Sequence, residues 1–159
     1  MRVALGADHH GVALKASVRR ALDEAARGGS SAPAHTYVDF GAHAEGAVDY
    51  PDFAQPVAEG VASGAFDRGV LICGSGVGMS IAANKVPGVR AALVHDCDGA
   101  RLCREHNDAN VVALAGRSLA PDTAVAIVET FLATPAAGGR HERRRTKISA
   151  MERCLEGAT

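Results

Sequence analysis

The sequence predicts an α/β protein, a Rossmann-like three-layer α/β/α domain built around a five-stranded parallel sheet. Short apolar runs, of the kind found in buried parallel strands, alternate about five times with segments of helical periodicity. Only 4% of the residues are aromatic and Trp is absent, so the core must be built from small aliphatic side chains, which suit closely packed layers. With 159 residues, the chain is expected to form one domain, residues 1–159.

The N-terminal part is expected to supply two strands, Arg2–Ala7 and Thr36–Phe40, each followed by a helix. The first helix is indicated by an apolar stripe formed by Leu14, Val18, Leu22 and Ala25. Gly28–Pro33 is expected to be a loop. Pro51 opens the second helix, where its missing N–H costs nothing, and this helix is expected to continue to about Ser63.

The C-terminal part is expected to supply the other three strands: Val70–Ile72, Arg90–Val94 and Val111–Ala115. Asp96 is placed to cap a helix that reaches about His106, and Pro121 opens another that reaches Leu132. A basic helix over residues 140–156 follows. Its apolar stripe is expected to be Ile148, Met151 and Leu155.

Composition narrows the classes of function. The formal net charge is −1, so a general surface for nucleic acid or for a membrane is not expected. Neither a secretory signal nor an apolar run long enough to span a bilayer is visible, which predicts a cytoplasmic protein. The cysteines form no C-x-x-C pair, so we expect free thiols and no zinc site. They are Cys73, Cys97, Cys103 and Cys154.

The stretch from Arg68 to Asn84 carries the most distinctive chemistry. A predicted strand passes through C-G-S-G-V-G, residues 73–78, into a helix, so several backbone N–H groups are expected to converge and attract negative charge. The spacing is not G-x-G-x-x-G, which disfavours NAD, and a tight turn without a ligand is the alternative. Cys73 at this strand end is placed to act as a base or a nucleophile. The same N–H groups could stabilise an oxyanion.

Polar residues follow two other predicted strands, namely Asp8-His9-His10 and His95-Asp96. The carboxyl ends of parallel strands share one edge of the sheet, so these groups are expected to meet Cys73 there. Asp8-His9-His10 is interpreted either as a solvated turn or as a polar loop that binds a sugar phosphate. The same three letters occur in the DHH phosphoesterases, but the further Asp and His motifs of those metal enzymes are missing here.

The segment over residues 140–145, with the sequence R-H-E-R-R-R, is strongly basic. Arg140 and Arg144 lie four residues apart, hence on one helical face, where they could bind one phosphate group together. The alternatives are a solvated basic tail and an RNA-binding segment, and the lack of interleaved aromatic residues disfavours RNA. His106 could be a helix C-cap or a catalyst. Arg117 could be an anion ligand or a surface charge.

Together these motifs resemble those of the ribose-5-phosphate isomerase type B family, which also contains the galactose-6-phosphate isomerase subunits. The matching segments are Gly6-Ala7-Asp8-His9, Asp49-Tyr50-Pro51, Cys73-Gly74-Ser75-Gly76-Val77-Gly78, Ala82-Ala83-Asn84-Lys85, Arg104-Glu105-His106-Asn107-Asp108 and Gly138-Gly139-Arg140-His141 with Arg144. They occur in family order along nearly the whole chain. A single motif of this kind would be weak, whereas the whole set makes the resemblance specific.

The resemblance implies catalytic roles. Cys73 matches the proton acceptor that moves hydrogen between C1 and C2 of a sugar phosphate through a cis-enediol, without a metal or another cofactor. One branch of the family lacks this cysteine and uses a glutamate where Met79 stands here, so the chain resembles the cysteine type. His106 matches the group that opens the furanose ring, Ser75 helps to stabilise the enediolate, and Asp8 lies on the sugar hydroxyls.

The resemblance also implies the ligands of the substrate. The implied binding residues are Asp8, His9, Tyr50, Gly74, Ser75, Gly76, Val77, Gly78, Asn107, Arg117, Arg140 and Arg144. Among them, the 74–78 turn matches the anion hole for the enediolate. His9 and the three arginines match the residues that bind the phosphate group.

The expected protein is a homodimer or tetramer that interconverts ribose 5-phosphate and ribulose 5-phosphate. The family's site lies between subunits, which implies that helix 140–156 packs at the interface and that the His106–Arg117 segment serves the partner's Cys73. Galactose 6-phosphate, allose 6-phosphate and a tetrose 4-phosphate remain alternative substrates. A non-catalytic module that binds a sugar phosphate or a nucleotide remains the alternative class. His10 and the long Gly28–Pro33 loop depart from the family pattern and could border the sugar end.

Overall fold

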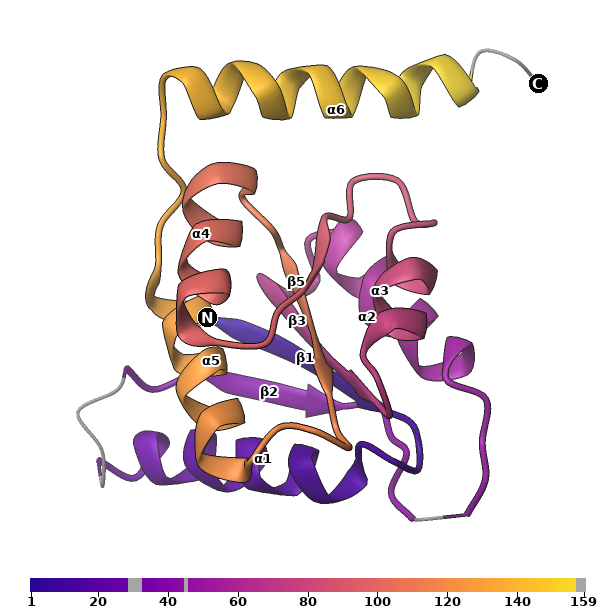
Figure 1. Cartoon of the computed structure of the whole chain (residues 1–159), viewed down its shortest axis with the longest axis vertical. Helices are drawn as coiled ribbons and strands as arrows, with labels where there is room; N and C mark the ends of the chain where they lie inside the picture. Colours follow the sequence, from indigo (N-terminus) through magenta and orange to yellow (C-terminus); the bar gives the residue numbers. More distant parts are fainter. Residues whose placement is uncertain (29–32, 45, 157–159) are drawn as a thin grey trace.

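Parallel strands form the sheet at the centre of the protein (Figure 1): β1 (Arg2–Ala7), β2 (Thr36–Asp39), β3 (Arg68–Cys73), β4 (Ala91–Leu93) and β5 (Val111–Ala115). The computed structural model describes residues 1–28, 33–44 and 46–156, with side chains through residue 152. The five strands lie in the order β2-β1-β3-β5-β4, and every neighbouring pair is parallel. The predicted five-stranded parallel sheet is confirmed.

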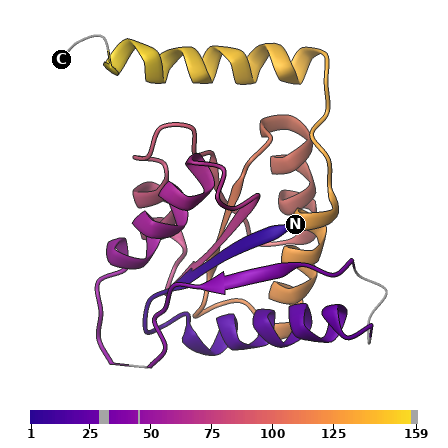
Figure 2. The same ribbon diagram turned by 180° about the vertical axis from the view of Figure 1, so that it is seen from behind.

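Both faces of this sheet are covered by the helices α1 (Val12–Ala26), α2 (Pro51–Ala62), α3 (Val77–Ala83), α4 (Cys97–Asn107) and α5 (Pro121–Ala133), and the helix α6 (Arg140–Glu156) follows them in the chain. Helices α1, α4 and α5 pack on one face, and α2 and α3 pack on the other (Figures 1 and 2). Parallel crossovers are right-handed, so connections that run in opposite directions across the sheet place their helices on opposite faces. The predicted three-layer arrangement is confirmed.

The alternation of side chains along β3 divides the core into two layers. Val70 and Ile72 face the layer of α1, α4 and α5, whereas Leu71 and Cys73 face the layer of α2 and α3. All four side chains are buried. Because successive strand residues point to opposite faces, the sheet is covered on both sides by apolar contacts, as its continuous apolar strands require. The Cys73 thiol therefore lies on the side of the short helix α3.

Element boundaries differ from the expected ones by a few residues. Strand β2 ends at Asp39 and β4 is reduced to three residues, Ala91–Leu93, because both are edge strands with one pairing partner. The expected cap of α4 is confirmed, since the Asp96 carboxylate accepts a hydrogen bond from the Gly99 N–H at 2.7 Å. Residues 29–32 of the expected Gly28–Pro33 loop lie outside the described part. Within the described residues, no helix is long and apolar enough to cross a membrane.

Helix α6 lies apart from the layers, beyond α4 and at the end of the domain away from α1 (Figure 1). Its apolar stripe is largely uncovered within the chain, since Ile148 is 39% exposed and Met151 is 67% exposed. The side chain of Leu155, the third residue of that predicted stripe, lies outside the described part. A long helix with an uncovered apolar stripe is typical of a segment that packs against another chain.

Candidate active site

The carboxyl ends of β1 and β3 lie side by side where the strand order changes direction. The chain moves from β1 to β2 on one side, then returns to β3 on the other side of β1. Asp8 directly follows β1 and Cys73 ends β3, and the Asp8 N–H donates to the Ile72 carbonyl at 3.0 Å. In open parallel sheets the crevice at such a switch point is where ligands bind. We call this side of the sheet the carboxyl edge and the opposite side the amino edge.

Asp8 is fixed by the backbone of its own loop. Its carboxylate is 6% exposed, and Oδ1 accepts hydrogen bonds from the N–H groups of His10 at 2.9 Å and Gly11 at 3.1 Å. A side chain on Gly11 would lie 2.5 Å from the Ile72 carbonyl oxygen, so only glycine allows this loop to approach β3 so closely. The next residue, His9, accepts a hydrogen bond at Nδ1 from the Val48 N–H at 3.3 Å. The first loop thus presents a carboxylate in a fixed orientation.

Cys73 lies under the glycine turn with its thiol 4% exposed, and Sγ accepts a hydrogen bond from the Gly76 N–H at 3.2 Å. Its environment differs from that of Cys103, which lies in the layer of α1, α4 and α5 and donates its thiol hydrogen to the Ala100 carbonyl at 3.2 Å. Burial raises the pKa of Cys103 to about 11. Cys103 is therefore a structural thiol, whereas Cys73 is the thiol that meets a backbone donor at the carboxyl edge. Of the cysteines whose side chains are described, Cys97 is also free.

The glycine turn is held from both sides by close packing. Gly76 caps α3 with a φ of +74°, and a side chain there would lie 2.5 Å from Leu93 and 3.0 Å from the Leu114 backbone. At Gly78, a side chain would lie 2.7 Å from the Tyr50 ring, which therefore rests directly on the turn. The N–H groups of the turn are consequently fixed in place, as an anion hole requires.

Arg117 and His10 lie together above Gly74, the residue after Cys73. The Arg117 N–H donates to the Gly74 carbonyl at 3.2 Å, and Arg117 Nη2 lies 2.6 Å from His10 Nε2. Both side chains lie 3.4 Å from the position that a side chain on Gly74 would occupy. Arg117 thus belongs with Cys73 of its own chain, which corrects the expectation that the whole His106–Arg117 segment serves a partner. His10 contacts Arg117, one of the residues expected to bind the phosphate.

His106 and Asn107 lie at the amino edge, far from this group. Helix α4 leads from the carboxyl end of β4 to the amino end of β5, so its last residues lie at the opposite end of β5 from Arg117. The His106 ring stacks on the ring of His141 in α6, with centroids 4.1 Å apart and planes 6° from parallel. His141 is 9% exposed, and its Nδ1 has no hydrogen-bond partner among the described residues. Burial, together with His106 and the neighbouring arginines, lowers the pKa of His141.

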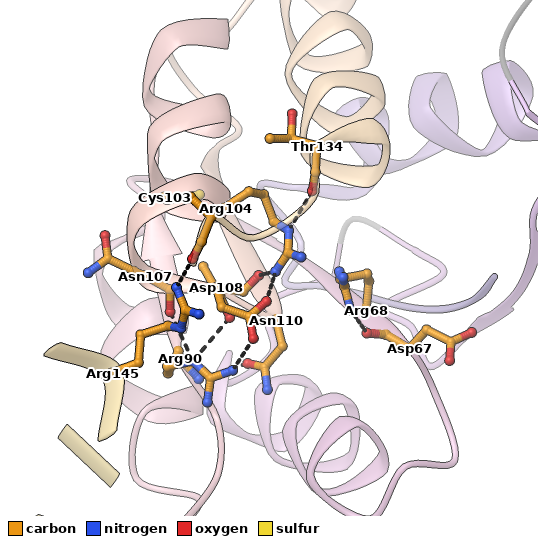
Figure 3. A network of polar contacts seen from close by, with 12 residues as sticks. Asp67, Arg68, Arg90, Cys103, Arg104, Asn107, Asp108, Asn110, Thr134 and Arg145 are labelled. Atoms are coloured by element: carbon orange, nitrogen blue, oxygen red, sulfur yellow. Dashed lines mark hydrogen bonds and ion pairs between the residues drawn. The ribbon is translucent and has the colours of Figure 1, made fainter. Parts of the chain in front are cut away.

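A network around Arg104 holds the end of α4 in place (Figure 3). The Arg104 side chain is 2% exposed and donates to the Thr134 carbonyl at 3.1 Å, the Asp108 carboxylate at 2.7 Å and the Ala109 carbonyl at 2.6 Å. Asp108 also pairs with Arg90 at 3.1 Å. These bonds connect α4, the start of β5 and the segment that leads into α6. They therefore fix the position of His106 and Asn107 relative to α6.

Arg140 and Arg144 lie in the first turns of α6, and both are exposed. They carry no ion pair among the described residues, although Arg140 Nε lies 3.3 Å from His141 Nε2. Their charges are therefore available to an anion at the amino edge. In the described part of the chain, no cluster of three or more His, Cys, Asp or Glu residues could hold a metal ion.

Residues 3–148 match the model of a family described as ribose/galactose isomerase. The chain belongs to this family. Among its relatives, ribose-5-phosphate isomerase B of Escherichia coli (strain K12) is 41% identical over 151 residues, covering 95% of this chain and 96% of the relative. The putative sugar phosphate isomerase YwlF of Bacillus subtilis (strain 168) is 46% identical over 153 residues, covering 96% of this chain and 97% of the relative.

Solved structures of the ribose/galactose isomerase family agree with the fold. Ribose-5-phosphate isomerase B of Clostridium thermocellum superposes with a TM-score of 0.90 at 46% identity, covering 98% of this chain and 99% of that chain. The Mycoplasma genitalium ribose-5-phosphate isomerase B, solved with bound ribulose-5-phosphate, has a TM-score of 0.86 at 39% identity and covers 96% of both chains. The resemblance found in the motifs is thereby confirmed.

Within this isomerase-family chain, the expected site residues fall into two groups. The carboxyl edge holds Asp8, His9, Tyr50, Cys73, Gly74, Ser75, Gly76, Val77, Gly78 and Arg117. The amino edge holds His106, Asn107, Arg140 and Arg144. Neither His10 nor His141 was among the site residues expected from the sequence, although His10 follows His9 and His141 follows Arg140 in the chain.

Proposed function

We propose that this chain is an aldose–ketose isomerase that interconverts ribose 5-phosphate and ribulose 5-phosphate without a metal ion. The observation that carries the proposal is the placement of Cys73, under a fixed turn of backbone N–H groups and beside Asp8, at the switch point of the sheet. The family and the names of the relatives support the same reaction.

In the proposed mechanism the Cys73 thiolate removes the proton from C2 of the open-chain aldose. The electron pair of that C–H bond moves to form the C1–C2 double bond, and the carbonyl oxygen gains the negative charge. The N–H groups of the glycine turn and Ser75 would stabilise this enediolate oxygen. Cys73 then returns the proton to C1, the hydroxyl proton of the C2 oxygen passes to the negatively charged C1 oxygen, and the C2 oxygen becomes the ketone. The Asp8 carboxylate would hold a sugar hydroxyl, since its Oδ1 is already fixed by backbone donors.

We further propose that one complete site needs two chains, with α6 at the interface. His106 would then open the ring, and Arg140 and Arg144 would bind the phosphate, at the carboxyl edge of a second copy. Three observations support this arrangement: the separation of the two groups of residues, the exposed apolar stripe of α6 and the arginines at its start, which form no ion pair within the described part of the chain. Arg117 would act within its own chain. A cytoplasmic location and a dimer or tetramer stay predictions.

The test of the proposed function is an isomerase assay with four-, five- and six-carbon aldose phosphates, with and without EDTA. We expect turnover of ribose 5-phosphate to exceed that of the other substrates and to be unchanged by EDTA. A preference for a six- or four-carbon aldose phosphate would show that ribose 5-phosphate is not the substrate. Activity abolished by EDTA would contradict the metal-free mechanism. No turnover with any of them would overturn the assignment as an isomerase.

Replacing Arg144 with alanine is expected to raise the KM for ribose 5-phosphate about tenfold or more, because a charge-assisted hydrogen bond to phosphate is lost. The kcat should change little, since the phosphate lies away from the reacting carbons. Arg143→Ala is the matched control, because this neighbouring arginine is also exposed but lies on a different face of α6. Equal effects of the two substitutions on KM would show that only the general charge of α6 matters.

A further inference from the structure

His10 is an exposed imidazole with a defined contact to one charged group. Its Nε2 lies 2.6 Å from Arg117 Nη2. A guanidinium can only donate hydrogen bonds, so Nε2 must be the acceptor and the ring hydrogen must lie on Nδ1. His10 therefore orients the Arg117 side chain above Gly74.

His10 is held in place through its backbone and through one face of its ring. Its backbone N–H donates to Asp8 Oδ1 at 2.9 Å, and its ring lies against the His9 ring with centroids 4.0 Å apart. The His10 carbonyl oxygen approaches Gly116 so closely that a side chain there would lie 2.6 Å away. The loop after β1 and the loop after β5 are thus packed together at this point. A group fixed in this way can hold a long side chain in one orientation.

Arg117 differs in the kind of partner that it has from the arginines that form ion pairs. Arg104 and Arg90 pair with the Asp108 carboxylate, Arg19 pairs with Asp39 and Arg101 pairs with Glu105. Arg117 has no carboxylate partner among the described residues. A carboxylate would orient the guanidinium but would also neutralise it, whereas a neutral imidazole orients it and leaves the whole positive charge.

We propose that His10 is a positioning residue that aims Arg117 at the phosphate group of the substrate while leaving the charge of Arg117 uncompensated. The inference rests on the proposed function for the identity of the substrate, a phosphate monoester. His10 contributes to phosphate binding through Arg117 and takes no part in the proton transfer at Cys73. Its effect therefore lies in KM and in the affinity for inorganic phosphate, with kcat unaffected.

Three substitutions separate orientation from charge. His10→Gln retains a neutral acceptor, His10→Leu removes the acceptor at similar volume, and His10→Glu supplies an acceptor that also neutralises Arg117. His43→Leu is the control, because His43 is an exposed histidine that pairs weakly with Asp39, away from Arg117. Binding of inorganic phosphate is measured by calorimetry on the full-length chain, and KM and kcat for ribose 5-phosphate are measured in parallel.

We expect His10→Leu to weaken phosphate binding about tenfold, the effect of one hydrogen bond that orients a charged group. His10→Gln should stay within about threefold of the unaltered chain. His10→Glu should bind phosphate at least as weakly as His10→Leu, and His43→Leu should have no effect. All variants should keep kcat.

Three results would overturn the inference: unchanged phosphate affinity in His10→Leu, equal affinity in His10→Gln and His10→Glu, or a loss of kcat at constant KM. Phosphate binding needs no turnover, so the comparison can be made even if the unaltered chain isomerises no sugar phosphate. A chain without isomerase activity would contradict the proposed function, but the calorimetric comparison of the His10 variants would still test the role of His10. An active unaltered chain that binds no inorganic phosphate would contradict the inference alone.

Discussion

Replacing Cys73 with serine is expected to lower kcat for ribose 5-phosphate isomerisation by roughly 10²- to 10⁴-fold, the usual contribution of a positioned general base. A hydroxyl gives up its proton far less readily than a thiol, so the Gly76 N–H would face a group that stays neutral. The affinity for inorganic phosphate should remain, because Arg117 and His10 do not contact the sulfur. Exchange of the C2 hydrogen with deuterated water, followed by NMR, measures the proton-transfer step directly.

The control for this substitution is Cys97→Ser, which changes an exposed thiol at the start of α4 and should leave kcat unchanged. Cys103 is a less suitable control, because it is buried in the layer of α1, α4 and α5. Turnover and deuterium exchange near the normal rate in the Cys73→Ser protein would eliminate Cys73 as the base. A loss of phosphate affinity along with kcat would indicate instead that the glycine turn had been displaced.

Replacing Arg104 with methionine is expected to lower the free energy of unfolding by about 3 kcal/mol. The side chain is 2% exposed, and its removal leaves the Thr134 and Ala109 carbonyls without their donors and Asp108 with only Arg90. For a chain of this size, the loss corresponds to a decrease in Tm of roughly 6–12 °C. Urea unfolding, measured at the same protein concentration for each variant, gives the difference.

Arg101→Met is the matched control for Arg104→Met. Both arginines lie in α4 and pair with a carboxylate, but Arg101 is 44% exposed and bonds to Glu105 and Asp98 at the surface. Exposed pairs contribute about 0–1 kcal/mol, so this variant should unfold almost like the unaltered protein. Similar losses of stability in the two variants would show that the buried network does not stabilise the fold. His106 should also lose its fixed position in Arg104→Met, with a decrease in activity.

Most of the fold could be predicted from the sequence because the signals are local. The apolar strands, the cap at Asp96 and the glycines that follow Cys73 each depend on residues close in the chain. The rule that carboxyl ends share an edge then placed Asp8 beside Cys73. The lengths of the edge strands could not be predicted, because they depend on which strands lack a second partner.

Contacts between distant segments were the part that the sequence could not supply. The His10–Arg117 contact joins residues 107 positions apart, and no pattern in the chain indicates that these two loops pack together. The stacking of His106 on His141 depends on the direction in which α6 leaves the domain. Arg117 and His106, treated as one segment in the sequence, lie at opposite ends of β5 because α4 leads into the amino end of that strand, whereas Arg117 follows its carboxyl end.

If one site is shared between two chains, as proposed, the separation of the site residues between two edges of one chain has a consequence for inheritance. A chain defective only at the carboxyl edge and a chain defective only at the amino edge would, when mixed, form one intact site per pair of chains. Two different inactive alleles in one cell would then restore part of the activity that neither supports alone, whereas two defects at the same edge would not. The pattern of recovery among alleles would thus sort residues by the edge on which they act.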